Sequence, residues 1–211
     1  MATRGKPVQV RGDAKREAIL AAAWDVFREC GYPAASMDEI TRRAGGSKIS
    51  VYAHFGSKAA LFEAVVRARA EIVAASFPAL DSPAGSIDKV LTALATAIVA
   101  GMSSPAVQDL HRVALSAQPG GADIGKLLYE HGTLRIVRGV AAVIETRMRA
   151  GELIVDDSMA AAEALFGMLL GTGYIRFALS VPERLTPAIK RKRITRAVRI
   201  FLAAYRAGSK H

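Results

Sequence analysis

The chain has 211 residues, a formal net charge of +10 and a sequence pI of about 10.1. Hydrophobic residues make up 51% of it, which is enough to bury a substantial core in one or two domains. This basic balance favours nucleic acid as the partner, with an anionic membrane surface as the second class.

Other features exclude further classes of protein. Cys30 is the only cysteine, so an intramolecular disulfide is excluded and a reducing cytoplasm fits. The first residues lack the apolar centre of a signal peptide. The most apolar run, between Glu163 and Arg176, has twelve uncharged residues, whereas a membrane span needs about 20. These features lead us to expect a cytoplasmic protein with no membrane segment. Because alanine is abundant and alternating apolar patterns are scarce, we also expect an all-α fold.

The first predicted helix covers residues 13–30. Its apolar residues recur at helical spacing and predict a buried face formed by Ile19, Ala22, Val26 and Cys30. The following sequence CGYPAAS stops the helix through Gly31 and Pro33. We expect the thiol of Cys30 to fill space in the core rather than to act as a redox sensor.

Serines mark the starts of the next three helices. Ser36 begins a short one, and Glu39, three residues later, completes a capping box. A glycine pair then makes a tight turn, and Ser47 caps a second short helix that ends at the next glycine. Ser57 caps a longer helix over residues 58–75.

About five more helices are expected, over residues 86–101, 104–116, 123–150, 157–180 and 187–206. The chain therefore divides into two predicted domains. Residues 1–57 form an N-terminal arm and a module of three short helices, and residues 58–211 form a larger helical bundle. The prediction is an all-α fold of about nine helices.

The segment GGSKISVYAHFGSK, residues 45–58, places hydroxyls, cations, a phenol and an imidazole on one short helix. On a helical wheel, Val51 and Phe55 form a stripe that faces the core, and Ile49 and Ala53 lie on the opposite side. Two polar pairs flank this outer ridge, namely Lys48 with Tyr52 and Ser50 with His54. The polar groups therefore do not converge on one point, as a catalytic site requires.

Two short helices joined by a glycine turn are typical of a helix-turn-helix, which enters the major groove of double-stranded DNA. Lys48 lies in the first turn of the second helix, the part that usually reaches base edges, and Ile49 can touch a thymine methyl group. The flanking donors can meet phosphates on both walls of the groove. The alternative is a solvated helix face, on which Tyr52 and His54 satisfy local hydrogen bonds.

The sequence from Ala18 to Val66 resembles the N-terminal domain of the TetR family of transcriptional repressors. The motifs that carry the resemblance are Gly31-Tyr32, Ser36, Tyr52 with Phe55, and Ser57-Lys58. The residues that it implies bind phosphates are Ser36, Tyr52, His54 and Lys58. It also implies that Lys48 and Ser50 occupy base-reading or groove-edge positions. Ile49 departs from the family pattern, since many members have a small residue there.

The segments AVQDLHRVALSAQP, LYEHG, RMRAGELIVDD and FLAAYRAG resemble the C-terminal domains of one TetR subgroup. The family resemblance implies a ligand-responsive homodimer that pairs its last two helices with their mates in a four-helix bundle, and a palindrome-like operator. The residues offered for that interface are Leu169, Leu170, Phe177, Ile194, Val198, Phe201, Leu202 and Tyr205. The alternative is that all of them belong to the core of their own subunit.

The middle helices also predict a site for a small, mostly apolar effector. Its candidate lining residues are Met102, Leu110, Val113, Leu128, Phe166 and Tyr174. His111 and Tyr174 are candidates for orienting the ligand, because such pockets hold a few polar groups among apolar ones. The alternative is that these side chains simply pack against one another.

Other candidate chemistry is weak. The spacings of Asp109, His111, Glu130 and His131 match no common zinc pattern, and no catalytic constellation is visible, so we predict no metal, no cofactor and no enzyme. An architectural DNA-binding protein without an effector, and a helical-bundle enzyme that uses these four residues, remain as alternatives. The basic run Lys190–Arg193 is either a solvated helix face, a membrane contact or a second nucleic-acid patch.

Overall fold

The computed structural model describes residues 7–76, 85–117, 124–179, 181 and 185–208. These residues form α-helices and one π-helical turn, and they contain no strand, so the all-α prediction is confirmed. The chain divides into two compact units, Met1–Ile72 with Asp109–Leu128 and Val73–Gln108 with Tyr129–His211. The predicted functional boundary after residue 57 stays a prediction.

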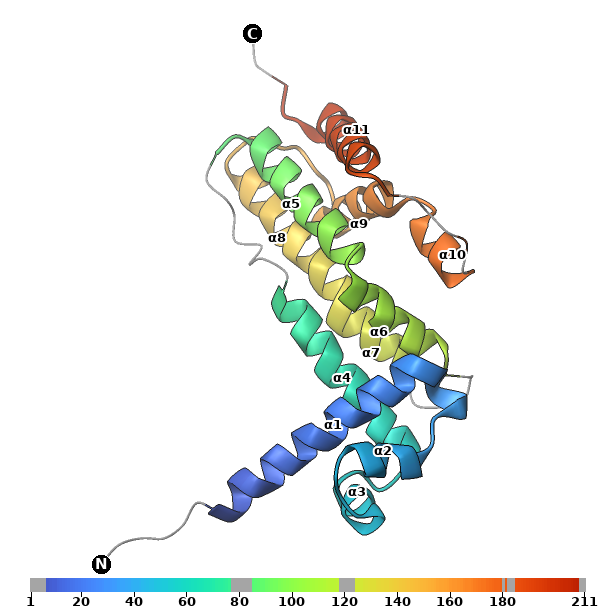
Figure 1. Cartoon of the computed structure of the whole chain (residues 1–211). Coiled ribbons are helices and arrows are strands. Elements are labelled where there is room, and N and C mark those ends of the chain that lie inside the picture. Colours follow the sequence, from blue (N-terminus) through green and yellow to red (C-terminus); the bar gives the residue numbers. More distant parts are fainter. Residues whose placement is uncertain (1–6, 77–84, 118–123, 180, 182–184, 209–211) are drawn as a thin grey trace, which may run out of the picture. The chain divides into compact units, whose positions relative to one another are not determined.

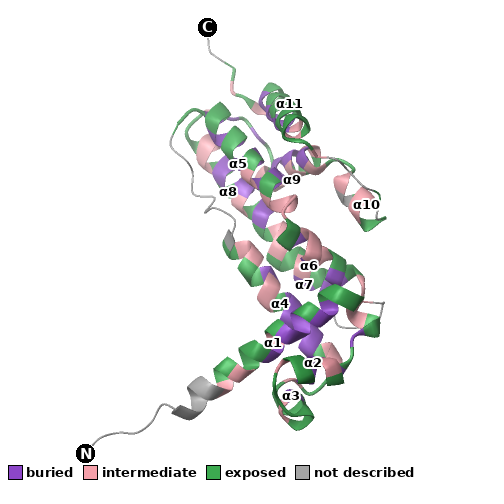
Figure 2. Cartoon of the chain, in the orientation of Figure 1, coloured by how far each residue is buried: buried purple, intermediate pink, exposed green. Residues whose placement is uncertain are grey.

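Helix α1 spans Pro7–Ala34 and is interrupted at Gly31, whose φ of 73° and ψ of 169° are not helical (Figure 1). The predicted stop at Gly31 is therefore correct, although the helix begins six residues earlier than the predicted Asp13. Its buried face, which Figure 2 shows in purple, includes Ile19, Ala22, Ala23, Trp24, Val26 and Phe27.

The prediction of a buried Cys30 is wrong, because this residue is exposed. Its thiol donates to the carbonyl of Val26 at 3.1 Å, one turn earlier in the same helix. Cys30 extends the apolar spacing of α1, but it sits in the last turn before the break at Gly31. The packing that buries Val26 and Phe27 does not extend to Cys30.

Serine caps open the next three helices as predicted. These helices are α2 (Met37–Arg43), α3 (Lys48–Phe55) and α4 (Lys58–Ser76). The hydroxyl of Ser36 accepts from the N–H of Asp38, that of Ser47 from Ser50, and that of Ser57 from Ala60. These bonds satisfy N–H groups that have no partner within the helix.

The serine half of the predicted capping box at α2 forms, but the predicted role of Glu39 is wrong. Glu39 does not return to the start of the helix, because its carboxylate accepts from the guanidinium groups of Arg42 and Arg43 at 2.7–2.8 Å. These three charge-assisted bonds are stronger than one bond to a neutral N–H. Ser36 alone therefore caps the helix.

An aromatic cluster joins α1 to α4 within the first unit. The rings of Phe27 and Phe62 meet edge to face with centroids 4.9 Å apart, and Tyr32 packs 4.7 Å from Phe62. Ile40 of α2 and Val51 of α3 are fully buried. Through these buried residues α2 packs against α1, and α3 packs against α2 (Figure 1).

The second unit is a helical bundle around one large core. Its helices are α5 (Ile87–Met102), the start of α6 (Pro105–Leu115), α8 (Leu134–Arg149), α9 (Ser158–Leu170), α10 (Gly173–Ala178) and α11 (Pro187–Tyr205). The predicted helix over 157–180 is broken at Gly171, whose φ of 55° favours glycine. The predicted helix over 123–150 is continuous through α7 (Ile124–Leu128) and the π-helical turn η1 (Tyr129–Thr133).

Most apolar residues offered for the dimer interface lie in the core of their own subunit. Leu169 and Phe201 have no exposed surface, and Ile194, Val198 and Leu202 are at most 8% exposed. They pack with α5 and α8 in a single cluster. The alternative of an intrasubunit core is therefore correct for these five residues.

No single helix among the described residues is both long enough and apolar enough to cross a membrane. Within the described ranges, the bent pair α5 and α6 meets that criterion when its two helices are taken together.

Candidate nucleic-acid interface

Helix α3 is anchored by one side and exposed on the other. Val51 is fully buried and Phe55 is half-buried, as the helical wheel predicts. On the outer side, Ile49 is 82% exposed. The other exposed residues of this face are Lys48, Tyr52, Ala53 and His54, while Ser50 is half-buried. A bulky isoleucine exposed to this degree has no role in the packing of the subunit.

A lysine side chain of α1 forms hydrogen bonds with the turn between α2 and α3. The ammonium of Lys15 donates to the carbonyl of Ala44 at 3.1 Å and to that of Gly45 at 2.9 Å. Gly46 leaves room for this side chain, because a Cβ atom there would lie 2.7 Å from the Nζ of Lys15. The cation also complements the negative end of α2. Sequence reasoning missed Lys15, since its partners follow 29 and 30 positions later.

Lys48, the predicted base-reading residue, already has a partner within the module. Its Nζ lies 2.6 Å from a carboxylate oxygen of Asp38 in the first turn of α2. This bond raises the pKa of Lys48, so the side chain is a full cation at neutral pH. Asp38 was missed, because an acidic residue in a first helical turn already has a local explanation in the helix dipole.

The arginines of α2 are engaged with carboxylates. Arg43 forms a two-bond pair with Glu29 of α1 and a further bond to Glu39, all at 2.7–2.8 Å. Arg42 also pairs with Glu39. The hydrogen bonds from Arg42 and Arg43 lower the pKa of Glu39 to about 2. These pairs link α2 to α1 on the surface of the module.

The predicted phosphate contacts lie in different surroundings. Tyr52 is 42% exposed, and His54 is exposed beside the ring of Phe55. Lys58 is half-buried, with its Nζ 3.2 Å from the carbonyl of Pro33 and 4.8 Å from the ring centroid of Tyr32. Lys58 therefore also has a structural role at the joint between α1 and α2.

Ser36 is exposed at the start of α2, where its hydroxyl caps the helix. Its oxygen accepts from the N–H of Asp38, so the hydroxyl proton remains available to a phosphate. The predicted DNA contacts thus lie at the start of α2, along α3 and at the start of α4. They are Ser36, Lys48, Ile49, Ser50, Tyr52, His54 and Lys58.

The predicted effector-site residues are divided between the two compact units. Leu110, His111, Val113 and Leu128 belong to the first unit, and Met102, Phe166 and Tyr174 belong to the second. Leu110 and Val113 are buried, and burial lowers the pKa of His111. Met102 and Phe166 pack against the core of the second unit. The side chain of Tyr174 lies outside the described residues. The effector site therefore stays a prediction.

Asp109, His111, Glu130 and His131 were the candidates for a metal site or a catalytic site, and they do not form a cluster of either kind. Asp109 pairs with Arg112 at 2.7 Å, and Glu130 and His131 are exposed on η1. Across the part of the chain that the structure describes, no three His, Cys, Asp or Glu side chains gather in a way that would hold a metal ion.

Two family descriptions match the chain and decide its identity. Residues 19–65 match the DNA-binding domain described as "Bacterial regulatory proteins, tetR family". Residues 89–207 match the "AefR-like transcriptional repressor, C-terminal domain". The chain belongs to the TetR family of transcriptional regulators. The TetR-family relatives are regulators rather than enzymes, which confirms the prediction that this TetR-family chain is not an enzyme.

Two related regulators are similar in sequence to part of this chain. The chain is 51% identical over 55 residues to the transcriptional activator FasR of Mycolicibacterium smegmatis, covering 26% of this chain and 25% of FasR. It is 32% identical to TtgW of Pseudomonas putida over 43% of this chain and 64% of TtgW. The matches therefore span less than two thirds of either relative.

Solved TetR-family structures match almost the whole chain. A putative regulator from Mesorhizobium loti superposes with a TM-score of 0.81 at 29% identity, covering 93% of this chain and 98% of the other. The Flavonoid-responsive Regulator FrrA superposes with a TM-score of 0.78 at 28% identity, covering 91% and 97%.

Proposed function

We propose that this chain is a transcriptional repressor that binds a palindrome-like operator as a homodimer and leaves it when a small, mostly apolar effector binds. The observation that carries the proposal is the outer face of α3. It combines a buried anchor at Val51 with an exposed ridge of Ile49 and Ala53 between donors. We infer a cytoplasmic location, because the partner is genomic DNA.

The ridge of α3 fits the major groove of double-stranded DNA. A methyl-sized residue such as Ala53 permits close approach, and the exposed side chain of Ile49 can contact a thymine methyl group. Lys48 in the first turn can donate to guanine O6 or N7, while Tyr52, His54 and Lys58 donate to phosphates. Ser36 adds a phosphate contact at the start of α2.

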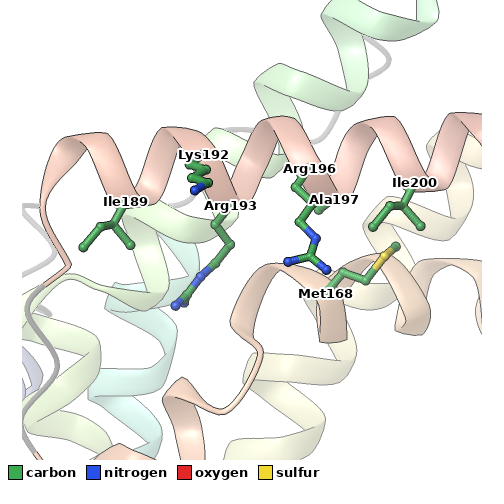
Figure 3. Close-up of a pocket in the computed structure, with 7 residues that line it drawn as sticks. All are labelled: Met168, Ile189, Lys192, Arg193, Arg196, Ala197 and Ile200. Atoms are coloured by element: carbon green, nitrogen blue, oxygen red, sulfur yellow. The ribbon is translucent and has the colours of Figure 1, made fainter.

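The proposed dimer surface is the outer side of α10 and α11. Ile175, Leu179, Ile189 and Ile200 are between 42% and 69% exposed there. A groove of about 450 Å³ runs between α9 and α11. Figure 3 shows its lining, which consists of Met168, Ile189, Lys192, Arg193, Arg196, Ala197 and Ile200. A second copy that covers these apolar groups would remove them from water. The guanidinium of Arg193 donates to the carbonyl of Leu170 at 3.3 Å, whereas Lys192 and Arg196 are exposed and can direct their charged ends outward.

The direction of regulation is supported by the C-terminal domain. FasR, the relative with high identity in the DNA-binding region, is named an activator, whereas the C-terminal match is described as a repressor domain. The C-terminal match covers residues 89–207, more than half of the chain. It therefore favours repression.

The effector class follows from the residues and from one relative. Leu110 and Val113 are apolar and buried, and His111 beside them has a lowered pKa, so its imidazole is neutral at pH 7. A neutral imidazole can donate to or accept from a small uncharged ligand. FrrA is named a flavonoid-responsive regulator, which makes aromatic compounds the first class to screen.

The test begins with selection of bound sites from random double-stranded DNA. A palindrome-like consensus is expected, and apolar aromatic compounds are then screened for release of the protein from it. An effector that weakens DNA binding tenfold must bind the free protein tenfold more tightly than the DNA complex, about 1.4 kcal/mol. Binding to all sequences alike would instead favour an architectural DNA-binding protein without an effector.

A further inference from the structure

The ion pair between Asp38 and Lys48 joins the two helices of the helix-turn-helix on their exposed surface. The side chain of Asp38 is 71% exposed and that of Lys48 is 55% exposed, with 2.6 Å between the charged atoms. Exposed pairs of this kind contribute little to the stability of a fold. The helix dipole of α2 explains a carboxylate at position 38 but not its pairing with Lys48, the residue that faces the bases in the proposed complex.

Asp38 differs from the other paired carboxylates of the module. Glu29 and Glu39 pair with arginines of α2, and Asp25 pairs with Arg28 of α1. The proposed complex uses none of these arginines. Asp38 instead pairs with Lys48, and its N–H is bonded to the hydroxyl of Ser36 at 3.2 Å. Asp38 is thus in contact with two residues of the proposed DNA interface. A negative charge at this place repels phosphates.

The chemistry of lysine explains what such a contact does. The ammonium has three N–H donors on a flexible four-carbon chain, so an unrestrained Lys48 can reach phosphates in DNA of any sequence. When one donor is held by Asp38, two remain for a base edge. The carboxylate can also accept from the N4 amino group of cytosine. We propose that Asp38 is a specificity-determining residue that holds Lys48 toward the bases and penalises binding to phosphates alone.

This inference rests on the proposed placement of α3 in the major groove, and its test separates the two. The variant is Asp38→Asn, which keeps the size of the side chain and removes its charge. The control is Asp25→Asn, which removes the same charge from α1, where the nearest basic partner, Arg28, is 3.9 Å away. Binding is measured by fluorescence anisotropy on the selected operator duplex and on a scrambled duplex, across a range of salt concentrations.

Asp38→Asn is expected to bind the scrambled duplex about threefold to tenfold more tightly, with a salt slope about 0.9 steeper, as one added phosphate contact predicts. Operator affinity rises less, so the ratio of operator to scrambled affinity falls. Adding Lys48→Ala to Asp38→Asn is expected to restore the shallower slope. Thermal melting should show that both single variants remain folded.

Three results would overturn the inference. Equal effects of Asp38→Asn and Asp25→Asn would mean that only net charge matters. Weaker binding of Asp38→Asn to the scrambled duplex would mean that the carboxylate helps phosphate binding. If Lys48→Ala changed neither affinity nor slope in either background, the placement of α3 would fail together with this inference. A clear effect of Lys48→Ala without one of Asp38→Asn would contradict the role of Asp38 alone.

Discussion

The main-chain N–H of Tyr32 donates a hydrogen bond to the hydroxyl oxygen of Ser116 at 2.9 Å, across 84 positions of sequence. The same hydroxyl donates to the carbonyl of Val113 at 2.6 Å. Ser116 thus connects the end of α6 with the break in α1 that precedes α2. Because α6 carries Leu110 and His111 of the proposed effector site, we propose that this bond links effector binding to the DNA-binding helices.

The first prediction is that Ser116→Ala weakens the coupling between effector binding and DNA binding. The partly buried N–H of Tyr32 loses its acceptor, at a cost of about 1 kcal/mol in the free energy of unfolding. The ratio of DNA affinities without and with effector should also fall. Ser103→Ala is the matched control, because the hydroxyl of Ser103 donates to the carbonyl of Val99 one turn earlier in the same helix. An unchanged affinity ratio in Ser116→Ala would contradict the proposed route.

The second prediction concerns the turn between α2 and α3. In Gly46→Ala the new methyl group would meet the Nζ and Cε of Lys15 at 2.7 and 2.9 Å, so the lysine must shift, which disturbs its bonds to the carbonyls of Ala44 and Gly45. We expect the free energy of unfolding to fall by roughly 0.5–1.5 kcal/mol, the usual net value of such a hydrogen bond. DNA binding should weaken as well, because the turn that orients α3 is then less well fixed. Lys15→Met should give a similar loss.

Gly12→Ala is the control for this substitution, since an added Cβ atom there has no neighbour within 4 Å. It should leave binding unchanged and stabilise α1 slightly. If Gly46→Ala bound DNA like wild type in titrations, the lysine contact would not position α3.

The third prediction separates base contacts from phosphate contacts. Lys48→Ala should lose about 1–3 kcal/mol of discrimination between the operator and a variant duplex. Lys58→Ala should weaken binding to all duplexes and lower the salt slope by about 0.9. Because Lys58 also holds the carbonyl of Pro33, its folding must be checked by thermal melting. Identical behaviour of the two variants across sequences and salt would argue against this division of roles.

The fourth prediction concerns acid stability. The pKa of Glu39 is lowered from 4.5 to about 2 in the folded chain, so its ion pairs stabilise the fold fully above pH 4.5. That contribution is lost as the pH falls from 4.5 toward 2. Glu39→Gln should therefore show a smaller fall in urea midpoint over this range than wild type. Glu63→Gln, which removes one exposed pair with Arg67 on α4, is the control and should follow wild type more closely.

The fifth prediction uses two neighbouring residues of α11. Ile200 is 42% exposed and lines the groove, whereas Phe201 is fully buried. Ile200→Glu should give folded monomers in sedimentation that have lost high-affinity operator binding. Phe201→Glu should unfold the second unit, since removal of a buried phenylalanine side chain alone costs about 3–5 kcal/mol. A dimeric Ile200→Glu would exclude this face of α11 from the interface.

The sequence by itself determined the features that depend on a few neighbouring residues. The caps at Ser36, Ser47 and Ser57 form within three residues of the helix starts, so the serines could be recognised without a fold. The break at Gly31 likewise follows from a backbone angle that glycine tolerates. The exposed and buried sides of α3 were predictable, because they follow from helical periodicity.

Only the tertiary structure decided which competing partner each side chain takes. Glu39 could have closed a capping box, but two arginines outcompeted the backbone for its carboxylate. Cys30 and Phe201 both continue apolar stripes, yet one is exposed and the other is buried. Lys15 and Ser116 bond to groups that are distant in sequence, and helical spacing carries no information on such contacts. These contacts depend on how the helices pack, and that packing cannot be deduced from a single sequence.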